Sequence, residues 1–349
     1  MDMSNLQIGL AGAGAVVLAG VVAHGAWVSR RNEPRQAQPA QLEPGLNSVH
    51  AGEPDGPGFN DSPMEPHGFS MPPPKKEVSL DALIDVLAPI GLEVPVSGEA
   101  ALAAMPPTHR VGSKHFALEG QNAVSRHLET PVAGQRYSAF LAGVQLANRL
   151  GPLNEIEYSE FVMKTQAFAD TVNGTPEFPE MRDEVARARE LDQFAGDHDA
   201  QLGFTVRARM AAWSPGYVHQ NAARLGFVPG AIAGRMSLPA LASGAPAVLG
   251  LSFDSQAAQA EDPTQTAIRE VTLSLDVAQV ERSEQAFVRM REAAQALALA
   301  MDGTVTDDNG LPLPGDAMDI IGSELEKLYD TLESRDLAAG SPQARRLFS

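Results

Sequence analysis

Residues 270–277 have the sequence Glu-Val-Thr-Leu-Ser-Leu-Asp-Val, and this stretch decides the fold of the C-terminal part of the chain. Apolar and polar side chains alternate along it, as they do in a β-strand that buries one of its two faces. Leu273 and Leu275 are therefore expected in a hydrophobic core, together with Phe253 from an earlier apolar run. We predict a strand over residues 269–277.

Two helices are predicted after this strand. Ser283 is the expected N-cap of the first, whose apolar residues recur at three- and four-residue spacing until Gly303 ends it. The second begins near Asp316 and keeps an apolar stripe as far as Leu332. Between them, residues 307–310 (Asp-Asp-Asn-Gly) predict a tight turn rather than a calcium loop, because the alternating ligand spacing and the closing glutamate are missing.

The residues before this strand supply the rest of one domain, which we place at 202–335. Residues 202–210 alternate, with Phe204 and Val206 on one face and Thr205 and Arg207 on the other. The remaining predicted elements are a helix over 215–225 and strands over 230–236 and 247–253. This order predicts an α+β fold in which helices cover one face of a layered, mostly antiparallel sheet.

A similar order of elements is predicted for residues 78–200. We expect strands over 83–87, 136–148 and 155–168, and then a helix over 180–194 after two prolines. Because the second half repeats this plan, the region is interpreted as a divergent repeat of residues 202–335.

The N-terminus predicts a membrane anchor. Residues 6–28 contain no charged side chain, and about 20 apolar residues span a bilayer core of roughly 30 Å. Ser29-Arg30-Arg31 follows at once, so the positive-inside rule predicts a periplasmic N-terminus and a cytoplasmic remainder at the inner membrane. Residues 32–77 are rich in Pro, Gly and Gln and are expected to be a disordered linker. Residues 336–349 are expected to be a flexible tail.

Composition excludes several classes of function. The chain has no cysteine, so it has no thiolate metal site, and its net charge of −18 argues against nucleic acid as a partner. No HExxH, P-loop or GxSxG pattern is present, and the eight histidines are dispersed. Residues 197–199 (Asp-His-Asp) cannot easily converge on one ion from a helix. We therefore predict no enzyme activity, no metal, no cofactor and no small-molecule substrate.

The chain resembles the ZipA proteins, bacterial cell division proteins that attach the FtsZ ring to the inner membrane. The resemblance is carried by residues 24–31 (His-Gly-Ala-Trp-Val-Ser-Arg-Arg), by residues 270–277 with the helix after them, by residues 305–308 and by the last helix. It implies an open sheet face on which the C-terminal tail of FtsZ docks at the septum. Carried over by strand, that face holds Gly203, Thr205, Arg207, Ile232, Gly250, Ser252, Thr272 and Ser274.

Most of these positions are small or polar, where the family has apolar residues. Such a face would bind weakly or differently, since docking of a helix depends on buried apolar area. Arg207 and Arg209 could bind an anion or acidic peptide, or could simply keep an exposed strand soluble. Two alternatives therefore stay open, namely a division or envelope scaffold that binds another protein and a periplasmic enzyme with the opposite topology.

Overall fold

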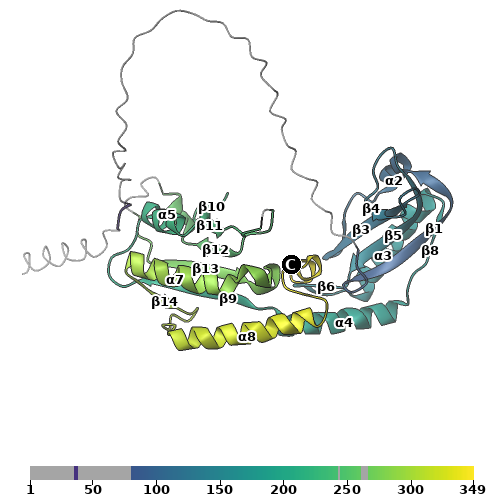
Figure 1. Cartoon of the computed structure of the whole chain (residues 1–349). Helices are drawn as coiled ribbons and strands as arrows, with labels where there is room; N and C mark the ends of the chain where they lie inside the picture. Colours follow the sequence, from purple (N-terminus) through teal and green to yellow (C-terminus); the bar gives the residue numbers. More distant parts are fainter. Residues whose placement is uncertain (1–34, 38–79, 243, 261–265) are drawn as a thin grey trace, which may run out of the picture. The chain divides into compact units, whose positions relative to one another are not determined.

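The computed structural model describes residues 35–37, 80–242, 244–260 and 266–349 (Figure 1). None of the helices formed by these residues is both long and apolar enough to cross a bilayer. The predicted anchor at 6–28, and the predicted linker at 32–77 apart from residues 35–37, lie outside the described residues.

The first half of the chain contains an antiparallel sheet with the strand order β2-β3-β5-β1-β8 and with β4 paired to β3. Its strands are β1 (Asp85–Ser97), β2 (Arg110–Val111), β3 (Lys114–Asn122), β4 (Leu128–Glu129), β5 (Arg136–Gln145) and β8 (Gly174–Pro176). A separate two-stranded ribbon follows, formed by β6 (Ala147–Asn148) and β7 (Gly151–Pro152). The predicted strand over 136–148 is confirmed as β5 and β6, whereas the one predicted over 83–87 begins only at Asp85.

Three helices accompany this sheet, namely α2 (Gly98–Ala104), α3 (Glu155–Thr171) and α4 (Met181–His198). The strand predicted over 155–168 is wrong, because these residues form α3. Asn154 caps the helix through the amides of Ile156 and Glu157, and the Glu157 carboxylate accepts the Asn154 amide in return. This capping box fixes a helix start that we did not recognise in the sequence. The helix predicted over 180–194 is confirmed as α4.

The core of the first half lies between the sheet and α3. Phe116, Phe140, Phe161 and Phe168 are all at most 2% exposed. Phe140 and Phe168 meet edge to face with their ring centroids 5.0 Å apart, a geometry that aromatic pairs prefer. One face of the sheet is therefore buried against helices.

The second half contains a six-stranded antiparallel sheet with the order β10-β11-β12-β13-β9-β14. The strands are β9 (Gln201–Ala208), β10 (Val228–Pro229), β11 (Arg235–Leu238), β12 (Leu249–Ser252), β13 (Glu270–Asp276) and β14 (Gly303–Thr306). The strands predicted over 202–210, 247–253 and 269–277 are confirmed within a few residues. Of the stretch predicted over 230–236, only Arg235 and Met236 belong to a strand, because residues 230–234 form the turn before β11.

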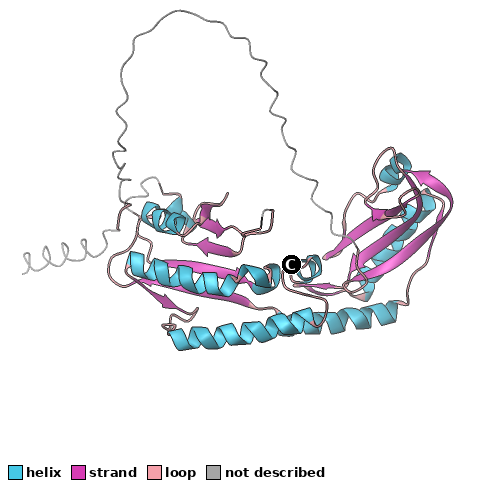
Figure 2. Cartoon of the chain, viewed as in Figure 1, coloured by secondary structure: helices cyan, strands magenta, loops and turns pink. Residues whose placement is uncertain are grey.

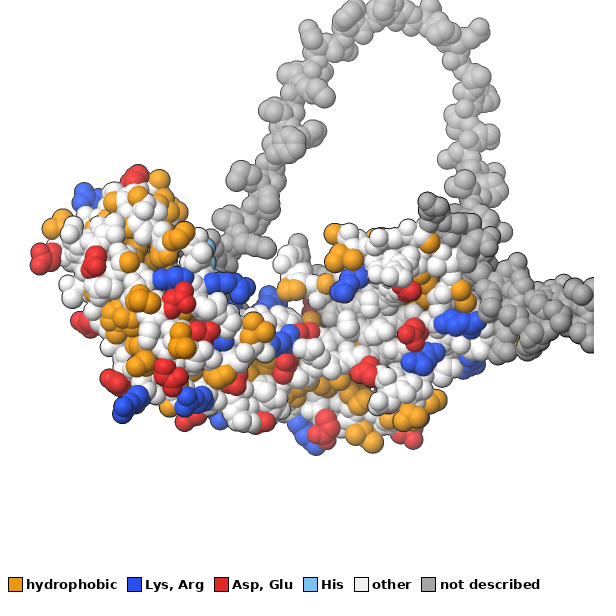
Figure 3. Space-filling model, turned by 180° about the vertical axis from the view of Figure 1, so that it is seen from behind, with side chains coloured by type: hydrophobic (Ala, Val, Ile, Leu, Met, Phe, Trp, Pro, Cys, Tyr) orange, Lys and Arg blue, Asp and Glu red, His pale blue; other side chains and the backbone are white. Residues whose placement is uncertain are grey.

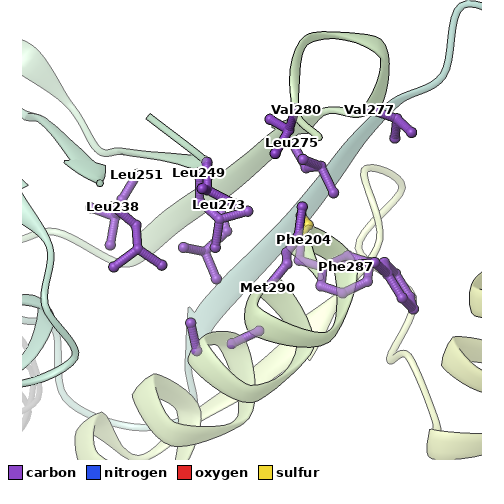
Figure 4. Packing of buried hydrophobic residues seen from close by; sticks show 14 of the residues in the cluster. Phe204, Leu238, Leu249, Leu251, Leu273, Leu275, Val277, Val280, Phe287 and Met290 are labelled. Carbon is purple, nitrogen blue, oxygen red and sulfur yellow. The ribbon is translucent and has the colours of Figure 1, made fainter. Parts of the chain in front are cut away.

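The helices of the second half are α5 (Pro215–Arg224), α6 (Ser255–Ala258), α7 (Ala286–Met301) and α8 (Gly315–Glu333) (Figure 2). Helix α7 begins after Gln285, which has a left-handed backbone, so Ser283 is not its N-cap. Leu273 and Leu275 lie at most 2% exposed beneath Phe287 and Met290 of α7, as Figure 4 shows. The predicted α+β fold with helices on one face of an antiparallel sheet is confirmed for this half.

The two halves share one order of connections. In each, the strand next to one edge of the sheet leads to a short helix, then to strands that follow one another from the far edge inward, then to a long helix, an edge strand and a second long helix. The first strand and the edge strand are β1 and β8 in the first half, and β9 and β14 in the second half. The sheets therefore have matching strand orders.

The C-terminal residues differ from the flexible tail expected over 336–349. They form helix α9 (Pro342–Leu347), and Leu347 and Phe348 are each 1% exposed in the core. The Arg346 guanidinium forms an ion pair with Asp85 on β1, whose side chain is completely buried. Short apolar segments near a chain end pack when a partner surface is present, and here that surface is the core of the second half, joined by Ile84 and Ala147 of the first half.

Residues 35–37 contact the second half. Arg35 forms a parallel bridge with Trp213: its amide donates to Ala212 (2.7 Å) and its carbonyl accepts from the Ser214 amide (2.9 Å). Its guanidinium donates to Asp302 Oδ2 at 2.8 Å. This part of the predicted disordered linker is therefore an ordered addition to the domain.

Candidate partner-binding face

The second sheet has one face turned away from α7, which we call the open face. Strand pairing places Thr205 beside Thr272 and Gly203 beside Ser274, and side chains on paired positions share a face. This face holds all the strand residues predicted for partner binding, which are Gly203, Thr205, Arg207, Gly250, Ser252, Thr272 and Ser274. The alternation of the sequence brings them together as expected.

The residues between them point to the core. Phe204, Val206, Leu251 and Leu273 are each at most 2% exposed, which fixes the register of the strands. Figure 3 views the molecule from the side opposite to α7, and over this sheet it is mostly white with few orange side chains. The open face is thus made largely of small and polar groups.

Ile232 reaches the open face from the turn between β10 and β11. Its side chain is 59% exposed. It lines a hollow of about 330 Å³ whose floor includes Gly250, Ser252 and Ser274. A Cβ added at Gly250 would lie 2.5 Å from Ser274 Oγ, so the missing side chain helps to form the hollow. Ile232 therefore lies at the same hollow as three of the predicted strand residues.

The other end of the open face is partly covered by the turn after β14. The predicted turn at 307–310 is confirmed, with Gly310 at φ +80° and its amide donating to the Asp307 carbonyl at 3.0 Å. The Asp308 carboxylate lies over Gly203, where an added Cβ would be 2.7 Å from Oδ1. Thr205 is only 7% exposed. The accessible part of the face consequently lies over β11, β12 and β13.

Charges on this face are mixed. Arg207 lies 3.4 Å from the Glu270 carboxylate, and both side chains are about half exposed. The Arg209 guanidinium donates to Thr304 Oγ1 at 2.9 Å. Arg207 is therefore balanced by a neighbouring carboxylate, which reduces its value for capturing a free anion. Sequence reasoning missed Arg235 and Ser237, because only the pairing of β11 with β12 shows that they share this face.

The described part of the chain contains no cluster of His, Asp and Glu that could hold a metal ion. Within residues 197–199, Asp199 accepts from the Arg149 guanidinium, and the His198 ring stacks on Phe194 at 4.3 Å. These side chains have separate structural partners and do not converge on one point.

Comparison with known proteins agrees with the geometry. Residues 255–323 match the family model described as "ZipA, C-terminal FtsZ-binding domain". The match covers β13, α7, β14 and the first part of α8, and β13 supplies Thr272 and Ser274 of the open face. No curated protein matches the chain. The resemblance of this part of the chain to the ZipA C-terminal domain, predicted from the sequence, is thereby confirmed for residues 255–323.

Proposed function

We propose that this chain is a single-pass inner-membrane protein of cell division that holds the FtsZ ring at the cytoplasmic face of the membrane. The family match supports a role in binding FtsZ. The uncharged stretch at 6–28, followed by Arg30 and Arg31, supports the anchor and its orientation. In this role the chain acts as a tether rather than as an enzyme, and it needs no cofactor.

The observation that carries the proposal is the hollow on the open face. Ile232 supplies an exposed apolar side chain at its edge, and Gly250, Ser252 and Ser274 leave room for a side chain of the FtsZ tail. Thr272 and Arg207 extend this surface toward β9, whereas Gly203 lies under Asp308 and Thr205 is only 7% exposed, so the tail would cross β11, β12 and β13.

A hollow with few apolar groups gives weak single contacts, because affinity grows with the apolar area removed from water. Weak contacts are sufficient for a tether. A polymer that offers many tails to many anchored domains binds through their combined effect, and this can exceed one contact by about two to four orders of magnitude.

The test is a titration of the full chain, reconstituted in nanodiscs, with the C-terminal tail peptide of FtsZ. We expect saturable binding in the micromolar range. Gly250→Val should fill the hollow and weaken binding at least about tenfold, an effect of 1.4 kcal/mol. Arg207→Glu should also weaken binding, and Arg189→Glu on α4 is the matched control. If the unchanged chain and the three variants bind the FtsZ tail peptide with equal affinity, the open face is excluded as its binding site.

A second candidate function is a division or envelope scaffold that uses the same fold to bind a different protein. The polar character of the open face favours this alternative, because it provides little apolar area for a helix. Absence of binding at millimolar FtsZ tail, with an intact fold by circular dichroism, would select it.

The matching strand orders of the two halves support a further part of the proposal. We infer that residues 78–200 descend from a duplication of the domain at 202–335, because two independent folds would not be expected to share this order of strands and helices, although β4 and the β6–β7 ribbon belong to the first half alone among the described residues.

A further inference from the structure

The first sheet also has a face that its helices leave uncovered. Its side chains are opposite to the core residues Val86, Ala88 and Ile90, which are completely buried. Pairing of β1 with β5 and of β3 with β5 puts Leu87, Pro89, Ala117, Ala139 and Leu141 together on this side. We call these five residues the first-sheet apolar face.

This face is accessible to a partner. Pro89 is exposed, and Leu87, Ala117, Ala139 and Leu141 are partly exposed. The Leu80 side chain lies over Gly143, which is paired with Leu87 on one side and with Ala117 on the other, and it fills the space of a Cβ there. Helix α9 covers the far end through Asp85 and Gln145. Beyond Leu80, on the side away from α9, the surface over Pro89 and Leu141 is apolar, whereas the open face of the second sheet carries hydroxyl groups and glycines.

Two exposed carboxylates, those of Glu93 and Glu177, lie beside the first-sheet apolar face, whereas a third, that of Glu119, is only 7% exposed. The Glu177 amide donates to the Pro89 carbonyl at 2.9 Å, so Glu177 stands beside Pro89 at the edge of the sheet. Across the sheet, Glu119 is paired with Leu141, and one oxygen accepts from the Leu80 amide at 3.0 Å. Glu93 follows Gly91 by two residues along β1, in a stretch where the pairing with β5 is irregular. Glu93 and Glu177 are exposed, and neither forms an ion pair with a described residue.

We propose that the first-sheet apolar face docks a peptide of a partner protein whose apolar side chains are flanked by Lys or Arg. Apolar residues in the middle provide the area to be buried, and the carboxylates at the edge favour a cation. Neighbouring strands lie about 4.8 Å apart, so β3, β5, β1 and β8 together span roughly 14 Å. That width fits one peptide helix of about 10 Å diameter or a short extended segment.

This inference goes beyond the FtsZ-tail proposal, because it concerns a different sheet and a different ligand chemistry. It gives the chain two docking faces with different preferences, one small and polar and the other apolar with an acidic edge. One tether could then hold two peptides at once.

The probe is a short fluorescein-labelled leucine–lysine peptide, and its partner probe has glutamate in place of lysine. Both are titrated into the full chain in phosphatidylcholine nanodiscs, with empty nanodiscs subtracted. We expect the lysine peptide to bind at least about tenfold more tightly than the glutamate peptide. Leu141→Thr, which keeps a strand-forming residue, should weaken the lysine peptide about fivefold.

Glu177→Lys should weaken the lysine peptide about threefold at low salt and less at high salt, because exposed charges are screened. Glu292→Lys on α7 changes the net charge equally and should leave binding unchanged, as should Val124→Thr, which alters a side chain that is 90% exposed. Equal binding of the two peptides would overturn the proposal. The proposal would also be overturned if the control variants lost as much affinity as Leu141→Thr. A third refuting result would be unchanged affinity in both Leu141→Thr and Glu177→Lys. Arg207→Glu should leave binding of the lysine peptide unchanged, and this result would distinguish the first-sheet apolar face from the site proposed for the FtsZ tail.

Discussion

Replacement of Arg346 by Met should test whether the C-terminal helix is held by a buried ion pair. Arg346 and Asp85 have side-chain exposures of 11% and 0%, so neither charge is well solvated. Removal of one partner from a buried pair costs about 3–5 kcal/mol, since the remaining charge is left uncompensated. Asp85 keeps one hydrogen bond, from the Asp81 amide at 2.9 Å, so we expect the lower end of this range.

The assay is urea denaturation of the full chain, followed by circular dichroism. Arg346→Met should lower the free energy of unfolding by about 3 kcal/mol, and adding Asp85→Asn should recover part of the loss because it removes the stranded charge. Arg189→Met is the matched control, because Arg189 and Glu155 are 64% and 59% exposed and such pairs contribute less than about 1 kcal/mol. A loss in Arg346→Met no larger than the control's would refute the reasoning.

Three more predictions concern stability and pH. Burial lowers the pKa of His219, so its ring binds a proton less readily in the folded protein than in the unfolded chain. The free energy of unfolding should therefore fall as the pH drops through about 6.5. Measured from about pH 7.5 to about pH 5, His219→Phe should remove the part of this decrease that His219 causes. Trp213→Phe should cost about 1–3 kcal/mol in thermal unfolding, because the Met301 carbonyl loses the indole N–H that donates to it at 2.7 Å; no change would mean that water replaces the donor. Gly303→Val should destabilise the second half by about 1–3 kcal/mol, since an added Cβ would lie 2.7 Å from Val206 Cγ1, and unchanged denaturation would show that β14 can shift.

The fold of the second half could be predicted because its sequence signals are local. Alternation places Phe204 and Leu273 on the inner face, and the apolar stripe of α7 needs no knowledge of the partner surface. The signal failed for α3, where the capping residues Asn154 and Glu157 outweighed an apolar pattern that resembled a strand. It also failed for residues 230–236, where the turn extends to Gly234, whose φ is +77°.

The surroundings of the candidate site were less predictable, because they depend on contacts between distant residues. The sequence indicated that Thr205 and Thr272 share a face, but not that Asp308 covers Gly203 or that Glu270 balances Arg207. The order of the C-terminal residues depends on Asp85, more than two hundred residues earlier in the chain. A single sequence gives no signal for such pairs.

The docking of Arg35 beside Trp213 changes how far the second half could stand from a membrane. If residues 6–28 span the bilayer, only six residues (29–34) lie between Val28 and Arg35, and the seven steps from Val28 to Arg35 reach at most about 25 Å in a fully extended chain. A free linker over 32–77 would have allowed roughly 40 Å on average. The second half would then be held within about 25 Å of the lipid surface. This short connection would also keep a bound filament close to the lipid surface.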